Sequence, residues 1–201
     1  MDYREKVTYD SKRRFCSYWH QIREALACEP RTILEVGTGS GFVSRYLRAV
    51  DITLTTCDIE DAYKPDVIAY IVNLPFADNA FDTVMACEVL EHLVYEEARG
   101  ALRELYRVTS RHVVISLPDA TPVACIQFPI PGVKKIKWLL NMPRFFPRAH
   151  QVTKHGHQWE IGKKNYPLSR VIGDMQKTGF TLKRTYRVFE NPYHRFFILQ
   201  K

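Results

Sequence analysis

The sequence predicts an α/β domain in which a mostly parallel β-sheet carries helices on both faces. Short apolar segments typical of buried strands alternate with segments of helical periodicity, and a glycine-rich loop follows the first of these strands. The chain has 201 residues, 46% of them hydrophobic and 25% charged, which suffices for one domain with a substantial core. We therefore expect residues 1–201 to form a single domain.

The predicted elements follow one another in a regular order. Residues 1–29 are expected to form an N-terminal helical segment, because apolar side chains recur at helical spacing at Phe15, Trp19, Ile22 and Leu26. Further helices are expected after the first strand, from about residue 90 to 108, and at 167–178. The strands are expected at residues 32–36, 52–58, 67–72, 82–88, 112–118, 180–188 and 195–200.

The stretch from about residue 121 to 166 interrupts this rhythm, and we predict that it is a cap or insertion over the active site. It contains five prolines mixed with aromatic and basic residues. No Asp or Glu occurs from Ala120 to Trp159, whereas six basic residues do: Lys134, Lys135, Lys137, Arg144, Arg148 and Lys154. In a chain of net charge +7, this block favours an anionic partner, with a merely solvated basic face as the alternative.

The N-terminal segment, the apolar runs and the cysteines all bear on the compartment in which the protein is expected. The first fifteen residues contain no apolar signal segment, and the apolar runs are too short to span a bilayer. The five cysteines are scattered without paired spacing, which is typical of reduced thiols. We expect a soluble cytoplasmic protein without stable membrane insertion, with peripheral contact to a membrane surface as the alternative.

The segment EVGTGSG (35–41) lies where a predicted strand meets a predicted helix. Gly37, Gly39 and Gly41 permit close approach of the backbone to a ligand, and the following helix offers unpaired N–H groups. Dehydrogenase fingerprints place their third glycine at a position that is Phe42 here, so the spacing differs from theirs. Because Asp58 ends the next strand, the context indicates a nucleotide-type site.

At these motifs the chain resembles the class I S-adenosylmethionine (SAM)-dependent methyltransferases, in particular their small-molecule, type 11-like branch. The resemblance covers about residues 30–118 and depends on ILEVGTGSG (33–41), Asp58, LPFADNAFD (74–82) and CEVLEHL (87–93), which occur in that order. It implies a Rossmann-like, seven-stranded, mostly parallel sheet with an antiparallel last strand and a cap insertion after the fifth strand.

The resemblance also implies contacts to SAM. Glu35 would bind the ammonium of the methionine part, Asp58 both ribose hydroxyls, and the Cys87 carbonyl a further ammonium proton. Tyr70 stands where relatives often carry an Asp that binds the adenine amino group, which implies a changed adenine contact. The candidate cofactor-binding residues are Glu35, Gly37, Thr38, Gly39, Gly41, Asp58, Ile59, Tyr70, Ile71, Cys87 and Glu88.

In ACEVLEHL (86–93), Glu88, Glu91 and His92 would project from one face of a helix. Three interpretations stay open. In the first, the acids have no chemical role and are simply favoured near a helix N-terminus by its dipole. In the second, His92 is a general base beside the methyl donor. In the third, the three side chains bind a divalent cation. A base is useful where the acceptor is a hydroxyl, because methyl transfer otherwise depends mainly on orientation.

The segment HQWEI (157–161) supports the cation hypothesis. ExxEH followed by H-x-aromatic-E resembles the plant small-RNA 2′-O-methyltransferases, which hold magnesium, and ExxEH alone resembles the quinone-biosynthesis O-methyltransferases. Such a ligand set suits Mn, Fe, Co or Zn, and Mg if water completes it. Of His150, His155 and His157 we expect His157 to enter the site. The candidate catalytic residues are His92, Glu91 and His157, and the candidate metal ligands are Glu88, Glu91, His92 and His157.

The predicted cap is expected to select the acceptor. KKIKWLLNMPRFF (134–146) fits a lid over an apolar acceptor, an anchor at an acidic membrane surface, or an RNA contact. We favour a hydroxyl, amine or carbon of a small or lipid-like molecule with an anionic group, with RNA as the alternative. A non-catalytic SAM-binding partner subunit is the alternative of another class. NPY (191–193) joins the last two strands and is expected to be a turn.

Overall fold

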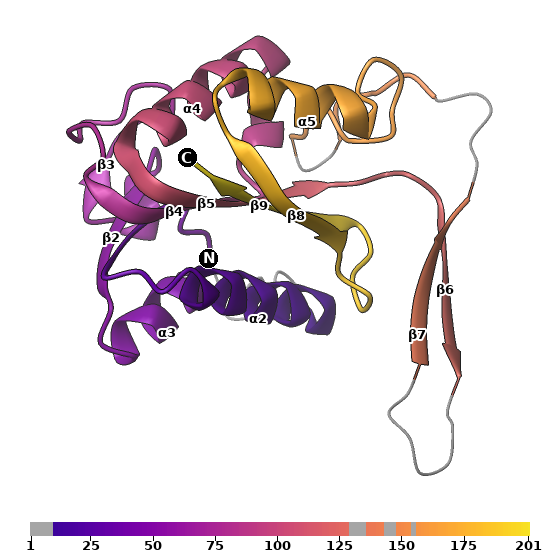
Figure 1. The fold of residues 1–201 in the computed structure, drawn as a ribbon, viewed down its shortest axis with the longest axis horizontal. Helices are drawn as coiled ribbons and strands as arrows, with labels where there is room; N and C mark the ends of the chain where they lie inside the picture. The colour runs from indigo at the N-terminus through magenta and orange to yellow at the C-terminus, as the bar shows by residue number, and fades with distance from the viewer. Residues whose placement is uncertain (1–9, 129–135, 143–147, 154–155) are drawn as a thin grey trace.

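The computed structural model describes residues 10–128, 136–142, 148–153 and 156–201, and in them seven strands form one sheet (Figure 1). The strand order is β3-β2-β1-β4-β5-β9-β8. The bounds are β1 Thr32–Val36, β2 Thr53–Asp58, β3 Val67–Ile68, β4 Phe81–Cys87, β5 Thr109–Pro118, β8 Thr181–Arg187 and β9 His194–Gln200. Strands β1 to β5 pair in parallel, while β9 runs antiparallel to both neighbours. The predicted fold class is confirmed.

Two layers of helices cover the sheet, as Figure 1 shows. Helices α2 (Lys12–Ala27) and α3 (Phe42–Ala49) pack on one face, and α4 (Tyr95–Val108) and α5 (Leu168–Lys177) on the other. Because side chains alternate along a strand, Ile33 of β1 packs into the first layer and Leu34 into the second. Both faces of the central strands are therefore buried, which explains their nearly continuous apolar sequences.

The predicted bounds of the 67–72 strand and the 90–108 helix were wrong, and so was the apolar stripe expected for the N-terminal helix. The apolar run 67–72 pairs only at its first two residues; Ala69 N–H then donates to the Asp58 carbonyl, and the chain turns. Two short 3₁₀ turns occur, η1 (Asp61–Tyr63) and η2 (Leu90–His92), and α4 begins only at Tyr95. In α2 the buried stripe contains Tyr18 and Ile22, whereas Phe15 and Trp19 are exposed. Apolar periodicity alone did not show which stripe faces the sheet.

The segment predicted as a cap contains a separate two-stranded hairpin, β6 (Val123–Phe128) and β7 (Ile136–Asn141). Figure 1 shows this hairpin standing away from the sheet. Further along, Ile161 forms a parallel bridge with Asp119 at the end of β5. Four of the predicted basic residues lie outside the described residues: Lys134, Lys135, Arg144 and Lys154.

None of the helices in the described parts of the chain combines the length and the apolar character needed to cross a bilayer.

Candidate active site

A cavity of about 870 Å³ opens at the carboxyl ends of β1, β2 and β4, where ligands bind in parallel α/β sheets. Its lining includes two of the candidate catalytic residues, His92 and His157. It also includes ten of the residues predicted to bind the cofactor: Glu35, Gly37, Thr38, Gly39, Asp58, Ile59, Tyr70, Ile71, Cys87 and Glu88. The two groups of predicted residues therefore share one cavity.

The glycine loop crosses directly over the ends of β1 and β2. Gly37 N–H donates to the Cys57 carbonyl at 2.9 Å, and the φ of Gly37 is 83°. A Cβ at this position would lie 2.3 Å from Val89 Cγ2, so a side chain would be excluded both by conformation and by contact. Thr38 then donates through its N–H and its hydroxyl to Asp58 Oδ2, at 2.8 and 3.2 Å. The loop and the acid that ends β2 form one unit.

Glu35 is buried at the base of this loop. Its Oε2 atom has no hydrogen-bond partner among the described residues, although the side chain lines the cavity. Burial raises the pKa of Glu35 to about 8. An unsatisfied carboxyl at the wall of a cavity is complementary to a ligand that brings a hydrogen-bond donor or a positive charge.

Two predicted cofactor residues differ from the expectation. Gly41 does not line the cavity; it has φ 69° and lies at the N-terminal end of α3. Tyr70 lines the cavity, but its hydroxyl donates to Glu97 Oε2 of α4 at 3.1 Å. The hydroxyl is thus held by α4, while the residue still lines the cavity.

Glu88, Glu91 and His92 do not lie on one helical face, so that prediction was wrong. Glu88 directly follows β4 with φ 57°, and its N–H donates to the Ser116 carbonyl. Glu91 and His92 follow on the 3₁₀ turn η2. Glu91 is fully buried and does not line the cavity, whereas His92 is exposed to it. The sharp turn after Glu88 replaces the expected helical relation.

The segment 157–161 packs against this turn and donates two hydrogen bonds to its backbone carbonyls. Gln158 N–H donates to the Glu91 carbonyl at 2.7 Å, and Trp159 Nε1–H donates to the Leu90 carbonyl at 3.2 Å. Trp159 is 2% exposed and packs in the core, which fixes the position of its neighbour His157. Two motifs separated by more than 60 residues therefore meet.

Glu91, His92 and His157 each offer a ligand atom, and these atoms lie within 4.8 Å of one another. Neither carboxylate oxygen of Glu91 has a hydrogen-bond partner among the described residues. Burial, followed by the nearby charge of Glu88, raises the pKa of Glu91 well above its usual range. Glu88 itself accepts from Ser116 Oγ at 2.8 Å, so it stands beside the cluster of three rather than in it.

His157 is held on its other side by a carboxylate and a phenol. Its Nδ1 lies 3.3 Å from Glu160 Oε1 and 3.3 Å from the Tyr193 hydroxyl. Tyr193 in turn donates to Glu160 Oε1 at 2.5 Å. A carboxylate at Nδ1 favours the tautomer in which Nδ1 carries the proton and Nε2 keeps its lone pair.

Several residues of the cavity were missed from the sequence. Tyr18, on α2, donates to Asp10 and lies 3.3 Å from Ser40 of the glycine loop. Tyr193 belongs to the connection between β8 and β9, and His194 begins β9; the NPY turn in this connection is present as predicted but also lines the cavity. His194 Nε2 lies 3.5 Å from Glu88 Oε2. Only the NPY motif offered a signal for this side of the site.

Comparison with known proteins identifies the central part of the chain. Residues 34–116 match the family model described as a methyltransferase domain. An uncharacterized protein of Methanocaldococcus jannaschii is 31% identical over 91 residues, which are 41% of this chain and 39% of that protein. The match thus spans about two fifths of the length of this curated relative.

Solved structures show the same fold over nearly the whole chain. A 1,6-didemethyltoxoflavin N1-methyltransferase of Burkholderia thailandensis, bound to S-adenosylhomocysteine, has a TM-score of 0.63 and 13% identity, covering 98% of this chain and 81% of that one. The N-methyltransferase NodS of Bradyrhizobium japonicum has a TM-score of 0.64 and 14% identity, covering 96% and 89%. Residues 34–116 thus match a methyltransferase domain, and the chain as a whole has the fold of these SAM-dependent methyltransferases.

Proposed function

We propose that the protein transfers a methyl group from SAM to a hydroxyl of a small or lipid-like acceptor that carries an anionic group. The observation that carries the proposal is the single cavity in which the glycine loop and Asp58 lie at one end and His92 and His157 at the other. Its volume of about 870 Å³ falls in the range of small-molecule sites. An amine or carbon acceptor would use the same cavity.

The residues at the glycine-loop end fit SAM. Glu35 has an unsatisfied carboxyl oxygen that suits the ammonium group, and Gly37 leaves open the backbone surface that a side chain would fill. Asp58 ends β2 at the cavity wall, where its carboxylate oxygens suit a ribose diol. Bound SAM supplies a methyl group that its sulfonium charge has already activated, so the chain itself must orient the acceptor and remove a proton.

The histidines at the other end supply the proton acceptor. His92 faces the cavity, and its ring centre lies 5.1 Å from that of His157. With Glu160 fixing the proton on Nδ1, Nε2 of His157 acts as a base, and His92 extends the path for the proton. The catalytic role is therefore assigned to both histidine rings. Glu91 is buried and does not line the cavity, so it acts only through its charge on the histidines.

Basic residues at the rim support an anionic group on the acceptor. Arg13 and Arg14 of α2 line the cavity together with His194. Guanidinium groups bind carboxylates and phosphates in a bidentate manner.

A metal-assisted reaction is the second candidate, and one observation favours it. Glu91 is a fully buried carboxylate with two unsatisfied oxygens, and its ligand atom lies within 4.8 Å of those of His92 and His157. A divalent ion there would supply the missing positive charge and, if it also held the acceptor oxygen, would lower the pKa of the hydroxyl. The mixed carboxylate and imidazole set suits Mn, Fe, Co or Zn.

The proposal is tested by incubating the purified protein with methyl-labelled SAM and fractionated cell extract. We expect label in the small-molecule or lipid fraction, and its loss with Asp58→Asn. Label in RNA would mean that the acceptor is RNA and not a small or lipid-like molecule. SAM binding without any labelled product would indicate a non-catalytic subunit. Activity that a chelator leaves unchanged, in protein shown to be metal-free, would remove the metal-assisted candidate.

A further inference from the structure

The β6–β7 hairpin has one face made entirely of apolar side chains. Directly opposite residues of an antiparallel pair project from the same face, and alternate residues share it. The pairs Ala124–Leu140, Ile126–Trp138 and Phe128–Ile136 therefore lie on one face, and none of these six residues is polar. A two-stranded sheet in water normally keeps such a face covered.

The opposite face of the hairpin is the one turned toward the sheet domain. Lys137, next to Trp138, places its ammonium 2.5 Å from Glu190 Oε1 and 5.1 Å from the ring centre of Phe189. Both partners belong to the connection between β8 and β9. Because neighbours along a strand point to opposite sides, the apolar face points away from the domain.

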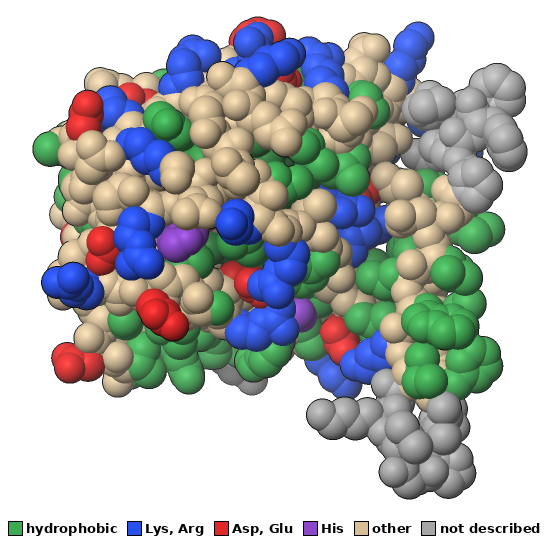
Figure 2. Space-filling view, in the orientation of Figure 1, with side chains coloured by type: hydrophobic (Ala, Val, Ile, Leu, Met, Phe, Trp, Pro, Cys, Tyr) green, Lys and Arg blue, Asp and Glu red, His purple; other side chains and the backbone are tan. Residues whose placement is uncertain are grey.

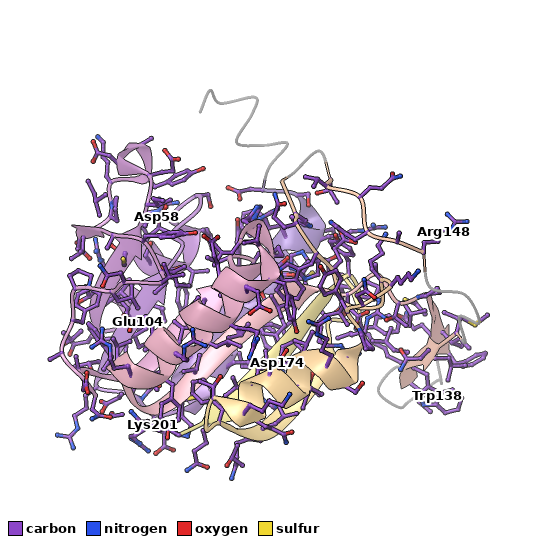
Figure 3. All side chains as sticks on the ribbon, turned by 90° about the horizontal axis from the view of Figure 1, so that it is seen from above. Asp58, Glu104, Trp138, Arg148, Asp174 and Lys201 are labelled. Atoms are coloured by element: carbon purple, nitrogen blue, oxygen red, sulfur yellow. The ribbon has the colours of Figure 1, made fainter. Side chains whose placement is uncertain are left out.

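Large side chains of the apolar face are exposed. Phe128 and Trp138 are each 54% exposed, and Leu140 is 48% exposed. Figure 2 shows hydrophobic side chains gathered on the hairpin, and in Figure 3 Trp138 lies far from Asp58 of the cofactor end. Large apolar side chains contiguous on a protruding element mark an interaction surface.

The root of the hairpin is fixed to the sheet beside the cavity. Arg187 donates to the carbonyls of Thr121 and Asp119 at 2.9 and 3.1 Å, and Met142 N–H donates to the Pro122 carbonyl at 2.9 Å. Asp119 N–H donates to the carbonyl of Tyr193, whose side chain lines the cavity. The root of the hairpin is therefore held next to a residue that lines the cavity.

We propose that this apolar face docks onto an anionic membrane surface. Tryptophan and phenylalanine with aliphatic neighbours are the side chains that enter the interfacial region of a bilayer. The chain carries a net charge of +7, and its stretch from Ala120 to Trp159 holds six basic and no acidic residues. The net positive charge of the chain complements acidic lipid headgroups.

Docking is shallow. In the described part of the chain, neither β6 nor β7 pairs with a further strand, so the outer backbone groups of the hairpin need water or headgroups as partners. The side chains enter the interface while the backbone remains at headgroup level. This inference does not rest on the proposed methyl transfer, since binding requires no SAM.

The test is co-sedimentation with vesicles of phosphatidylcholine alone or mixed equally with phosphatidylglycerol, without SAM. We expect binding to the mixed vesicles and a blue shift of tryptophan emission. The double variant Trp138→Ser, Leu140→Ser should bind at least about tenfold more weakly, because it removes two large apolar groups from the interface. The matched control is Trp19→Ser, which removes a tryptophan of 56% exposure from α2 and should leave binding unchanged.

Unchanged thermal unfolding and unchanged SAM affinity show that the double variant is folded. Three results would overturn the proposal: no binding of the wild-type protein to mixed vesicles, equal binding by the double variant, or a dimer that the double substitution dissociates. The last would identify a second copy as the occupant. Vesicle binding without methyl transfer would leave this inference standing while refuting the proposed function.

Discussion

Binding of SAM is expected to release a proton from Glu35. The carboxyl is 5% exposed, its Oε2 has no hydrogen-bond partner among the described residues, and burial raises its pKa to about 8. At pH 7 about nine-tenths of it is therefore protonated before SAM binds. An ammonium group placed beside it favours the charged form, so its pKa falls and the proton leaves.

The assay is isothermal titration with SAM at pH 7 in buffers of different ionisation enthalpy. We expect about 0.9 proton released per SAM bound by the wild-type protein. The variant Glu35→Gln should release correspondingly less, whereas Glu96→Gln, which removes an exposed carboxylate on α4, should not change the release. Equal proton release by wild type and Glu35→Gln would refute the placement of the ammonium at Glu35.

Three further predictions follow from the same geometry. Without SAM, Glu35 should make the free energy of unfolding fall as pH rises from 4.5 to about 8, because the folded state keeps the Glu35 proton that the unfolded state has lost; urea titrations of Glu35→Gln should show a smaller fall than the wild type, since buried Glu91 adds a fall of the same sign in both. Gly37→Ala should cost about 1–3 kcal/mol by urea titration and weaken SAM binding, since its Cβ would lie 2.3 Å from Val89; unchanged stability would contradict the contact. His92→Ala should lower turnover far more than SAM affinity, and equal loss of both would make it a cofactor-binding residue.

Much of the fold could be predicted because both sheet faces are buried. The run TILEV became β1 at the predicted bounds, and Asp58 ends β2 as expected. The run 67–72 misled because Ile71 is buried in a turn, and burial alone does not define a strand. Strand length depends on pairing partners, which a single sequence does not display.

The part of the candidate site built by the glycine loop and Asp58 was predictable from the sequence. The glycine loop and Asp58 meet as expected, because the ends of adjacent parallel strands are neighbours. The relation among Glu88, Glu91 and His92 was not predictable. Glu88 has a positive φ and its N–H donates to the Ser116 carbonyl of β5, a contact that local propensity does not reveal. The contributions of Tyr18 and Tyr193 depend on contacts between elements far apart in the chain.

The account depends most directly on which nucleotide cofactor the cavity takes. Parallel calorimetric titrations of the wild-type protein with SAM and with NAD decide this. The cavity geometry predicts one SAM bound per chain, strongly weakened binding by Asp58→Asn, and no binding of NAD. Binding of NAD without binding of SAM would contradict the assignment.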